Sequence, residues 1–169
     1  MPKYTNRSNR RARQWVISDI DSANLATTAT QLVRNMSSDY ESALGRTPAN
    51  VTVLAIRGTI STTIGASVAS NNSKLAYGIA WIPEGLVTVA ELPNPLTDDY
   101  DWIWRETVFK SGGTSGDQIT GPGTLPIIIN NKSMRRQRET VSKLCLIARW
   151  DGDQSVNRVA NIRTLYAMP

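Results

Sequence analysis

Residues 51–60 decide the fold of this chain, and their sequence is Val-Thr-Val-Leu-Ala-Ile-Arg-Gly-Thr-Ile. β-Branched and other apolar residues dominate this stretch, and a Thr/Ser run extends it to Ile64, which is typical of a β-strand. Apolar side chains occupy both the odd and the even positions. We therefore expect both faces of the strand to be largely buried.

Seven further stretches have a similar β-rich character and are separated by Gly, Pro, Asn and Asp: residues 14–20, 25–34, 74–83, 102–110, 125–133, 141–150 and 158–167. Only residues 35–44 suggest a short helix, with Ser37 or Ser38 as its N-cap and Glu41 completing a capping box. The connections are uneven and some are long, which favours a Greek-key sandwich or jelly roll over an up-and-down barrel. The sequence predicts an all-β fold of seven or eight strands.

The net charge is concentrated at the N-terminus. The 169 residues include 19 Lys and Arg against 14 Asp and Glu, a formal charge of +5 with a sequence pI of about 9.7. Residues 1–15 contain five of the basic side chains and no acidic one, so the rest of the chain is balanced. We predict a largely disordered basic arm at 1–15 and one globular domain at 16–169.

Composition excludes several kinds of active site. The chain has no histidine, so it has no Ser-His-Asp or Cys-His catalytic group and no imidazole zinc site. The single cysteine, Cys145, lies in the apolar run 144–148 and is predicted to be a core residue. No long apolar window or signal-like start is present, so we expect no membrane insertion. We predict no enzyme activity, no catalytic residue, no metal and no cofactor.

The arm has the composition of a nucleic-acid-binding segment. It combines cations that neutralise phosphates with aromatic rings that stack on unpaired bases. The candidate binding residues are Lys3, Tyr4, Arg7, Arg10, Arg11, Arg13 and Trp15. A solvated tail or a nuclear import signal, bound by a host import receptor, has the same pattern.

A second basic cluster lies between two predicted strands and consists of Lys132, Arg135, Arg136 and Arg138. It would extend the polyanion-binding surface, or it would be a solvated loop that pairs with the acidic residues Asp98, Asp99 and Asp101. The acidic stretch 98–101 has the carboxylates that Ca²⁺ prefers, but it lacks the Gly and the terminal Glu of an EF-hand loop. A solvated turn is therefore the favoured interpretation.

Two other features suggest structure rather than chemistry. The glycine-rich segment 112–116 lacks the Gly-Lys-Ser/Thr ending of a P-loop and is interpreted as a flexible loop. Four tryptophans lie in predicted strands, where large aromatics act as core or subunit-contact anchors: Trp81, Trp102, Trp104 and Trp150.

The order and spacing of several segments resemble the small jelly-roll coat proteins of circular, Rep-encoding single-stranded DNA viruses, chiefly environmental, uncultivated members. The segments are the Arg-rich start, residues 52–60 with an Arg57-Gly58 turn at the strand end, residues 101–105, residues 131–136 ahead of 144–148, and residues 162–166. The arm here is shorter than in many members of that family.

This resemblance implies a capsid protein whose domain at 16–169 is an eight-stranded antiparallel jelly-roll sandwich. It implies an icosahedral shell of 60 copies (T=1), with the arm facing the interior on single-stranded DNA, or on non-specific RNA when the chain is expressed alone. It implies localisation in the virion, and in the host nucleus during assembly. The alternatives are a non-viral nucleic-acid-binding β-barrel and a histidine-free β-sandwich enzyme. Concentration of charge in a tail, rather than along the strands, favours the capsid.

Overall fold

The computed structural model describes residues 12–25, 29–64, 74–86, 91–109, 124–130, 134–135, 142–152 and 156–167. These ranges contain β1 (Arg13–Ile17), β2 (Ile20–Leu25), β3 (Ala29–Asn35), α1 (Met36–Leu44), β4 (Thr52–Ile64), β5 (Lys74–Pro83), the 3₁₀ turn η1 (Glu84–Leu86), β6 (Trp104–Phe109), β7 (Thr124–Ile129), β8 (Met134–Arg135), β9 (Ser142–Asp151) and β10 (Val156–Ala167). The prediction of an all-β chain with one short helix is confirmed.

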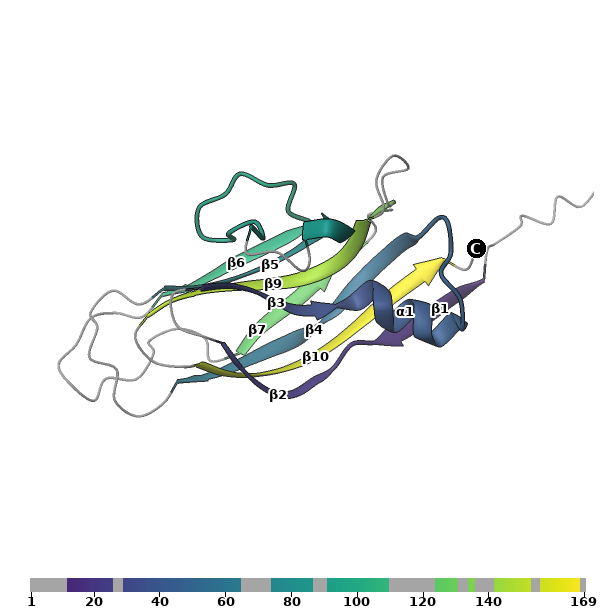
Figure 1. Ribbon diagram of the computed structural model, residues 1–169. Helices are drawn as coiled ribbons and strands as arrows, with labels where there is room; N and C mark the ends of the chain where they lie inside the picture. The colour runs from purple at the N-terminus through teal and green to yellow at the C-terminus, as the bar shows by residue number, and fades with distance from the viewer. Residues whose placement is uncertain are drawn as a thin grey trace, which may run out of the picture.

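The strands form two antiparallel sheets packed face to face (Figure 1). Sheet A has the order β1-β10-β4-β7, with β2 also paired to β10 and β8 to β4, and sheet B has the order β3-β9-β5-β6. If β1 and β2 count as one strand and β8 is left aside, the first strand pairs with the last, the second with the second-last, and so on inward. This is the pairing of a hairpin rolled into two sheets, the jelly roll.

The structure has ten strands rather than the eight predicted, mainly because the first strand is broken. The backbone N–H of Ser18 donates to the carbonyl of Ile162, while the Asp19 carboxylate accepts the N–H of Ile162. These bonds hold the interruption between β1 and β2 against β10, whose register to β2 shifts between Arg158 and Ala160. The tenth strand, β8, has only two residues.

The segment predicted as an arm, residues 1–15, includes the beginning of a strand. β1 begins at Arg13, opposite Ala167, so residues 13–15 belong to sheet A. Val16 is buried, and it lies between the exposed residues Trp15 and Ile17. This alternation is typical of a β-strand with one face on the core, and the buried Val16 anchors the strand. Residues 1–11 lie outside the described residues.

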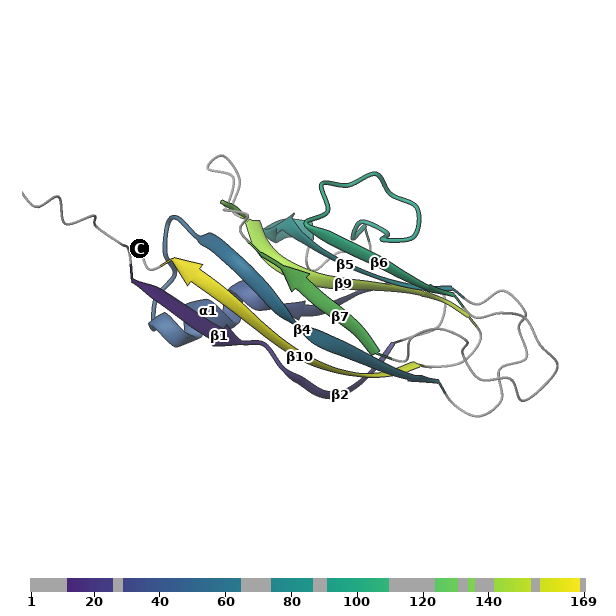
Figure 2. The same cartoon turned by 180° about the vertical axis from the view of Figure 1, so that it is seen from behind.

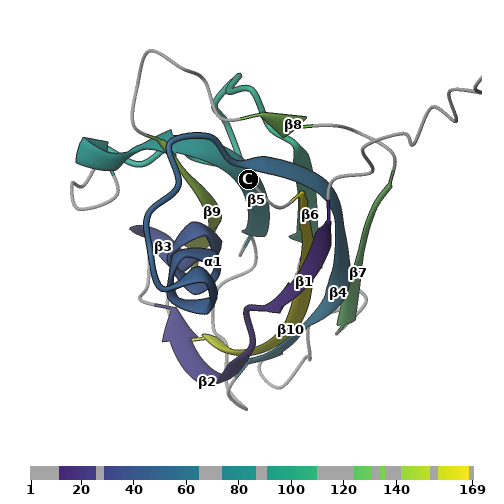
Figure 3. The ribbon, with the colours of Figure 1, turned by 90° about the vertical axis from the view of Figure 1, so that its right-hand side faces the viewer.

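The core lies between the sheets, with α1 at the end where β1 begins and β10 ends (Figures 2 and 3). Tyr40 of α1 stacks on Tyr166 of β10 with ring centroids 4.0 Å apart and planes at 3°. Tyr166 also donates its hydroxyl proton to the Met36 carbonyl at 3.1 Å. These contacts join the helix to the last strand and close that end of the core.

The start of α1 differs from the prediction. Its N-cap is Asn35, whose side-chain oxygen accepts the N–H of Ser38 at 3.2 Å. Ser37 is buried instead and accepts the N–H of Leu144 at 2.7 Å. Glu41 completes no capping box, because its carboxylate accepts two bonds from the buried Lys143 ammonium, at 2.7 and 2.9 Å. Long-range contacts to β9 therefore override the local capping pattern.

The helices among the described residues are all too short or too polar to cross a membrane.

Candidate nucleic-acid interface

Most of the predicted binding residues are not described. Lys3, Tyr4, Arg7, Arg10 and Arg11 lie outside the described residues, as do Lys132, Arg136 and Arg138. Arg13 and Trp15 lie in β1, and the backbone of Arg135 lies in β8, opposite Thr52. Whether the two basic clusters share a surface stays a prediction.

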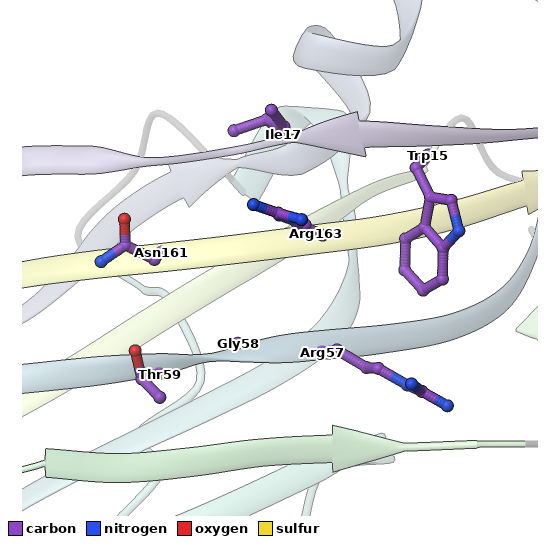
Figure 4. Close-up of a pocket in the computed structure, with 7 residues that line it drawn as sticks. All are labelled: Trp15, Ile17, Arg57, Gly58, Thr59, Asn161 and Arg163. Atoms are coloured by element: carbon purple, nitrogen blue, oxygen red, sulfur yellow. The ribbon is translucent and has the colours of Figure 1, made fainter.

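An open groove of about 660 Å³ lies on the outer face of sheet A. Three neighbouring strands line it: β1 contributes Trp15 and Ile17, β10 contributes Asn161 and Arg163, and β4 contributes a run of three residues, 57–59 (Figure 4). The indole of Trp15 extends from β1 toward β10 (Figure 4). The groove surface therefore combines an exposed aromatic ring with two guanidinium groups.

The two arginines lie side by side across the sheet. Arg163 of β10 pairs with Arg57 of β4, and the same row continues to Ile17 of β1 on one side and Ile128 of β7 on the other. Residues directly opposite in an antiparallel pair have Cβ atoms about 5 Å apart, and like charges there are destabilising. The pair lowers stability in the absence of an anion.

The strands that line the groove, and their neighbour β7, contain no acidic side chain; the one acidic residue in the described strands of sheet A, Asp21, lies in β2. The strands β1, β4, β7 and β10 contain four arginines and no Asp or Glu. The nearby Asp19 lies beyond the end of β1, where it accepts the Ile162 N–H. Arg57 is instead oriented by a neutral group, because its Nε and Nη2 both donate to Oδ1 of Asn130, at 3.1 and 3.0 Å. Its remaining N–H groups are available to a ligand.

A β-bulge points Arg57 outward. The register shifts between Leu165, which pairs with Ala55, and Tyr166, which pairs with Val53, so β4 has one extra residue at Leu54. Before the bulge the odd positions face the core, and after it the even ones do. The expectation that both faces of residues 51–60 are buried is therefore wrong: Arg57 and Thr59 are exposed.

Gly58 keeps the floor of the groove narrow. A Cβ at this position would lie 2.0 Å from the backbone carbonyl oxygen of Asn161 and 2.9 Å from the Cα of Ile162. Any side chain would push β4 away from β10. The Arg57-Gly58 turn expected from the resemblance does not form, since β4 continues through both residues to Ile64.

The outer face of sheet A also holds the large apolar side chains that the described part of the chain leaves exposed. They are Trp15 (46% exposed), Ile17 (56%), Ile128 (69%) and Val159 (37%). All lie on β1, β7 or β10. Together with Arg57 and Arg163 they form what we call the bare face, which offers cations and flat or apolar surface but no carboxylate.

A fourth arginine of sheet A points the other way. Arg158 is 5% exposed and lies between the sheets, where its Nε and Nη1 have no hydrogen-bond partner among the described residues. Desolvation lowers the pKa of this guanidinium, an effect that Tyr77 opposes. Arg158 is separate from the groove.

The acidic stretch 98–101 directly follows a turn at residues 95–97. Asp98 accepts the backbone N–H of Asn94 at 2.7 Å through one carboxylate oxygen and the hydroxyl of Thr97 at 3.0 Å through the other. Across the described residues, His, Cys, Asp and Glu form no group of three or more that could hold a metal ion. The Asp98 carboxylate thus stabilises the loop through hydrogen bonds.

The predicted roles of Cys145 and the tryptophans are confirmed where the structure tests them. Cys145 is buried, and burial raises the pKa of its thiol to about 12. Trp150 is fully buried, and Trp81 and Trp104 pack against the main core. Trp102 packs on the outer face of sheet B and donates its indole N–H to the Asp98 carbonyl at 3.1 Å.

Sequence reasoning missed the residues that complete the groove: Arg57, Thr59, Asn161 and Arg163. Arg57 and Arg163 belong to segments 52–60 and 162–166, which were interpreted only as strands. The alternation of residues 159–165 was an available signal, because it predicts that Arg163 faces solvent. The bulge that brings Arg57 into the same row had no signal in the sequence.

Comparisons with known proteins give likeness of fold only. No family model matches the chain, and no curated protein matches it. The solved structures similar to it include the following three, each with a TM-score of 0.37. A chain of the Kashmir bee virus empty particle at acidic pH has 8% identity and covers 89% of this chain and 72% of its own. A chain of the giant freshwater prawn Macrobrachium rosenbergii extra small virus (XSV) VLP has 9% identity, and the match covers 94% of this chain and 79% of that chain. The decameric BFDV capsid protein has 7% identity and covers 95% and 100%. Likeness at this level does not define a function.

Proposed function

We propose that this chain is a viral capsid protein that assembles with copies of itself into a small icosahedral shell of 60 subunits (T=1) and packages single-stranded DNA through non-specific charge. The observation that carries the proposal is the junction at Arg13: the basic arm, which holds four of the five excess positive charges, leads directly into the edge strand of a jelly roll. A subunit of this design joins a neutral, tileable body to a cationic segment for cargo.

Dimensions are consistent with the proposal. A body of about 155 residues has a globular radius near 19 Å, so sixty of them tile a shell of mean radius roughly 75 Å. An extended arm of 12 residues spans about 40 Å, long enough to enter the lumen from the inner wall. Sixty arms with the charge of residues 1–15 supply about 300 positive charges, which compete with counterions for phosphates.

The partners follow from this arrangement. They are further copies of the chain, a single-stranded DNA genome in the virion, and non-specific RNA when the chain is expressed alone. The arm would also serve as an import signal for a host receptor, with assembly in the nucleus. We further propose that the protein is not an enzyme: the groove that it exposes is lined by Arg, Asn, Thr, Gly, Trp and Ile, without a carboxylate or thiol to act as base or nucleophile.

Negative-stain microscopy of the expressed full chain tests the assembly, and deletion of residues 1–12 tests the packaging. We expect closed shells with an outer diameter of about 19 nm from both proteins. The deletion variant should contain much less nucleic acid, measured as the ratio of absorbance at 260 nm to that at 280 nm. A matched control replaces Lys3, Arg7, Arg10 and Arg11 by Gln, keeping the arm's length while removing its charge, and should lose cargo in the same way. Absence of shells, or unchanged cargo in both variants, would refute the respective half of the proposal.

A further inference from the structure

We infer that the groove on sheet A is a binding site for an unpaired segment of nucleic acid, with Arg57 and Arg163 on the phosphates and Trp15 stacked on a base. This inference rests on the proposed function in assigning the cargo, and it deepens it by adding a second, folded contact to the arm. No sequence pattern singled out Arg57 and Arg163 as a pair.

The charge arrangement points to a polyanion. Arg57 and Arg163 are directly paired in the register of β4 and β10, and strands β1, β4, β7 and β10 contain no acidic residue. Their side chains extend in different directions, with Arg57 directed toward β7 (Figure 4), so a nucleic-acid backbone that crosses the groove can contact them through separate phosphates. Asn130 fixes the orientation of Arg57 through two bonds to one oxygen, which reduces the entropy lost when the guanidinium engages a phosphate. Asn130 is thus a positioning residue.

The aromatic ring favours a single strand over a duplex. Trp15 pairs with Leu165, two residues from Arg163 on the same strand, so ring and guanidinium are diagonal neighbours about 7 Å apart at their Cβ atoms. Proteins that bind single strands without sequence preference place stacking rings beside cations in this way. In a duplex the base faces are already stacked on each other, so Trp15 and Ile17 have only the backbone to contact.

A second copy of the same face is a poor occupant of the groove. A two-fold contact between bare faces would bring two Arg57–Arg163 pairs together, and strands β1, β4, β7 and β10 would supply no carboxylate to them. Continuity with the arm favours nucleic acid instead. β1 begins directly after the arm, and its exposed residues Arg13, Trp15 and Ile17 alternate onto the bare face. A strand held by the arm can therefore continue into the groove.

Fluorescence anisotropy at low nanomolar full-length protein tests the inference, because mass action disfavours assembly at that concentration. The probes are a labelled 20-nucleotide oligo(dT), a 20-base-pair duplex and inorganic polyphosphate. The test variants are R57S/R163S and Trp15→Ala, with Trp15→Phe to restore a ring. The matched control is R46S/K74S, which removes the same charge from two exposed positions away from sheet A. Thermal melting of each variant verifies that it is folded.

R57S/R163S should lower the slope of log K against log salt for oligo(dT) by about 1.4, since each lost phosphate contact contributes about 0.7 on a single strand. The control should leave the slope unchanged. Trp15→Ala should weaken oligo(dT) binding about 5- to 150-fold, with Trp15→Phe close to wild type and polyphosphate binding unchanged. Duplex binding should change much less than oligo(dT) binding.

Equal slopes for R57S/R163S and the control would overturn the phosphate contacts. Equal losses for oligo(dT) and duplex on Trp15→Ala would overturn the stacking. Failure here is distinguishable from failure of the proposed function, because shells that contain nucleic acid can form while the groove variants bind as wild type does. Conversely, the groove variants can show the expected losses in a chain that forms no shell. That result would support the nucleic-acid site and refute the capsid proposal.

Discussion

The outer faces of the two sheets differ: that of sheet B is covered by a connecting segment, and that of sheet A is exposed in the described residues. Ala80, Ile82, Cys145 and Ile147 on the outside of sheet B are buried beneath the connection between β5 and β6, whose Trp102 and Tyr100 pack on them. The outside of sheet A has no such cover in the described residues and instead exposes large apolar side chains and arginines. One face therefore contributes to stability, while the other keeps surface free for a ligand.

The strand patterns match this division. Every residue of β9 from Ser142 to Ala148 is buried, as expected for a strand covered on both faces, whereas β10 alternates between buried and exposed residues along most of its length. Gly78 fits the cover on sheet B closely, since a Cβ there would lie 2.3 Å from the Trp102 ring. Gly58, on the bare face, also fits closely, but against the backbone of the neighbouring strand β10 and not against a covering side chain. The comparison indicates that the exposed Trp15 and the partly buried Trp102 have different roles.

The largest expected effect comes from removing the cover. Trp102→Ala should lower the free energy of unfolding by about 3 kcal/mol, because it uncovers an apolar cluster and leaves a cavity. Trp15→Ala should change it by no more than about 0.5 kcal/mol, since its side chain is half exposed. Urea unfolding of both variants measures the contrast. Equal losses of unfolding free energy in the two variants would mean that both outer faces contribute to stability to the same extent.

Gly58→Ala should cost about 2 kcal/mol, because the added methyl group meets the backbone of β10 rather than a movable side chain. Gly85→Ala is the matched control, with nothing within 4 Å of its Cβ, and should be neutral. Thermal melting compares the two. A harmless Gly58→Ala would show that the groove floor is looser than described.

Stability should fall at high pH through Cys145. Burial raises the pKa of this thiol from 9.0 to about 12, with Lys143 opposing the rise, so the unfolded chain ionises first. The stabilisation is complete below pH 9 and disappears as pH rises toward 12, at up to about 1.4 kcal/mol per pH unit. Between pH 8 and 10, the free energy of unfolding of Cys145→Ala should fall by about 1 kcal/mol less than that of the wild type. The measurement is urea unfolding of both proteins at each pH. If their free energies of unfolding depend on pH in the same way, then solvent reaches Cys145 beneath the cover over sheet B.

The smallest effect is a gain. Arg163→Thr should raise stability by about 0.5 kcal/mol at low salt, because it removes a like-charge neighbour of Arg57 and keeps a good strand former. The gain should shrink as salt screens the pair. Arg46→Thr, in an exposed loop, serves as control and should show no salt-dependent gain. A loss of stability in Arg163→Thr would contradict the idea that the pair is unneutralised.

Local sequence patterns predicted the strands well and the site only in part. Stretches such as 74–83 and 158–167 alternate or remain apolar over many residues, so they specify strands without help from the rest of the chain. The N-cap at Asn35 was missed because Ser37 and Glu41 bond to β9, more than a hundred residues away in sequence. Arg57 was missed because its direction depends on a bulge opposite Leu165, a property of two strands together.

Sedimentation velocity of the full-length protein, recorded at both 260 and 280 nm, tests most directly the claim that this jelly roll is a shell subunit that holds nucleic acid. We expect a megadalton boundary at neutral pH and moderate salt, with nucleic acid sedimenting in the same boundary and resistant to nuclease. A single species of 18.6 kDa without absorbance from nucleic acid would contradict the account.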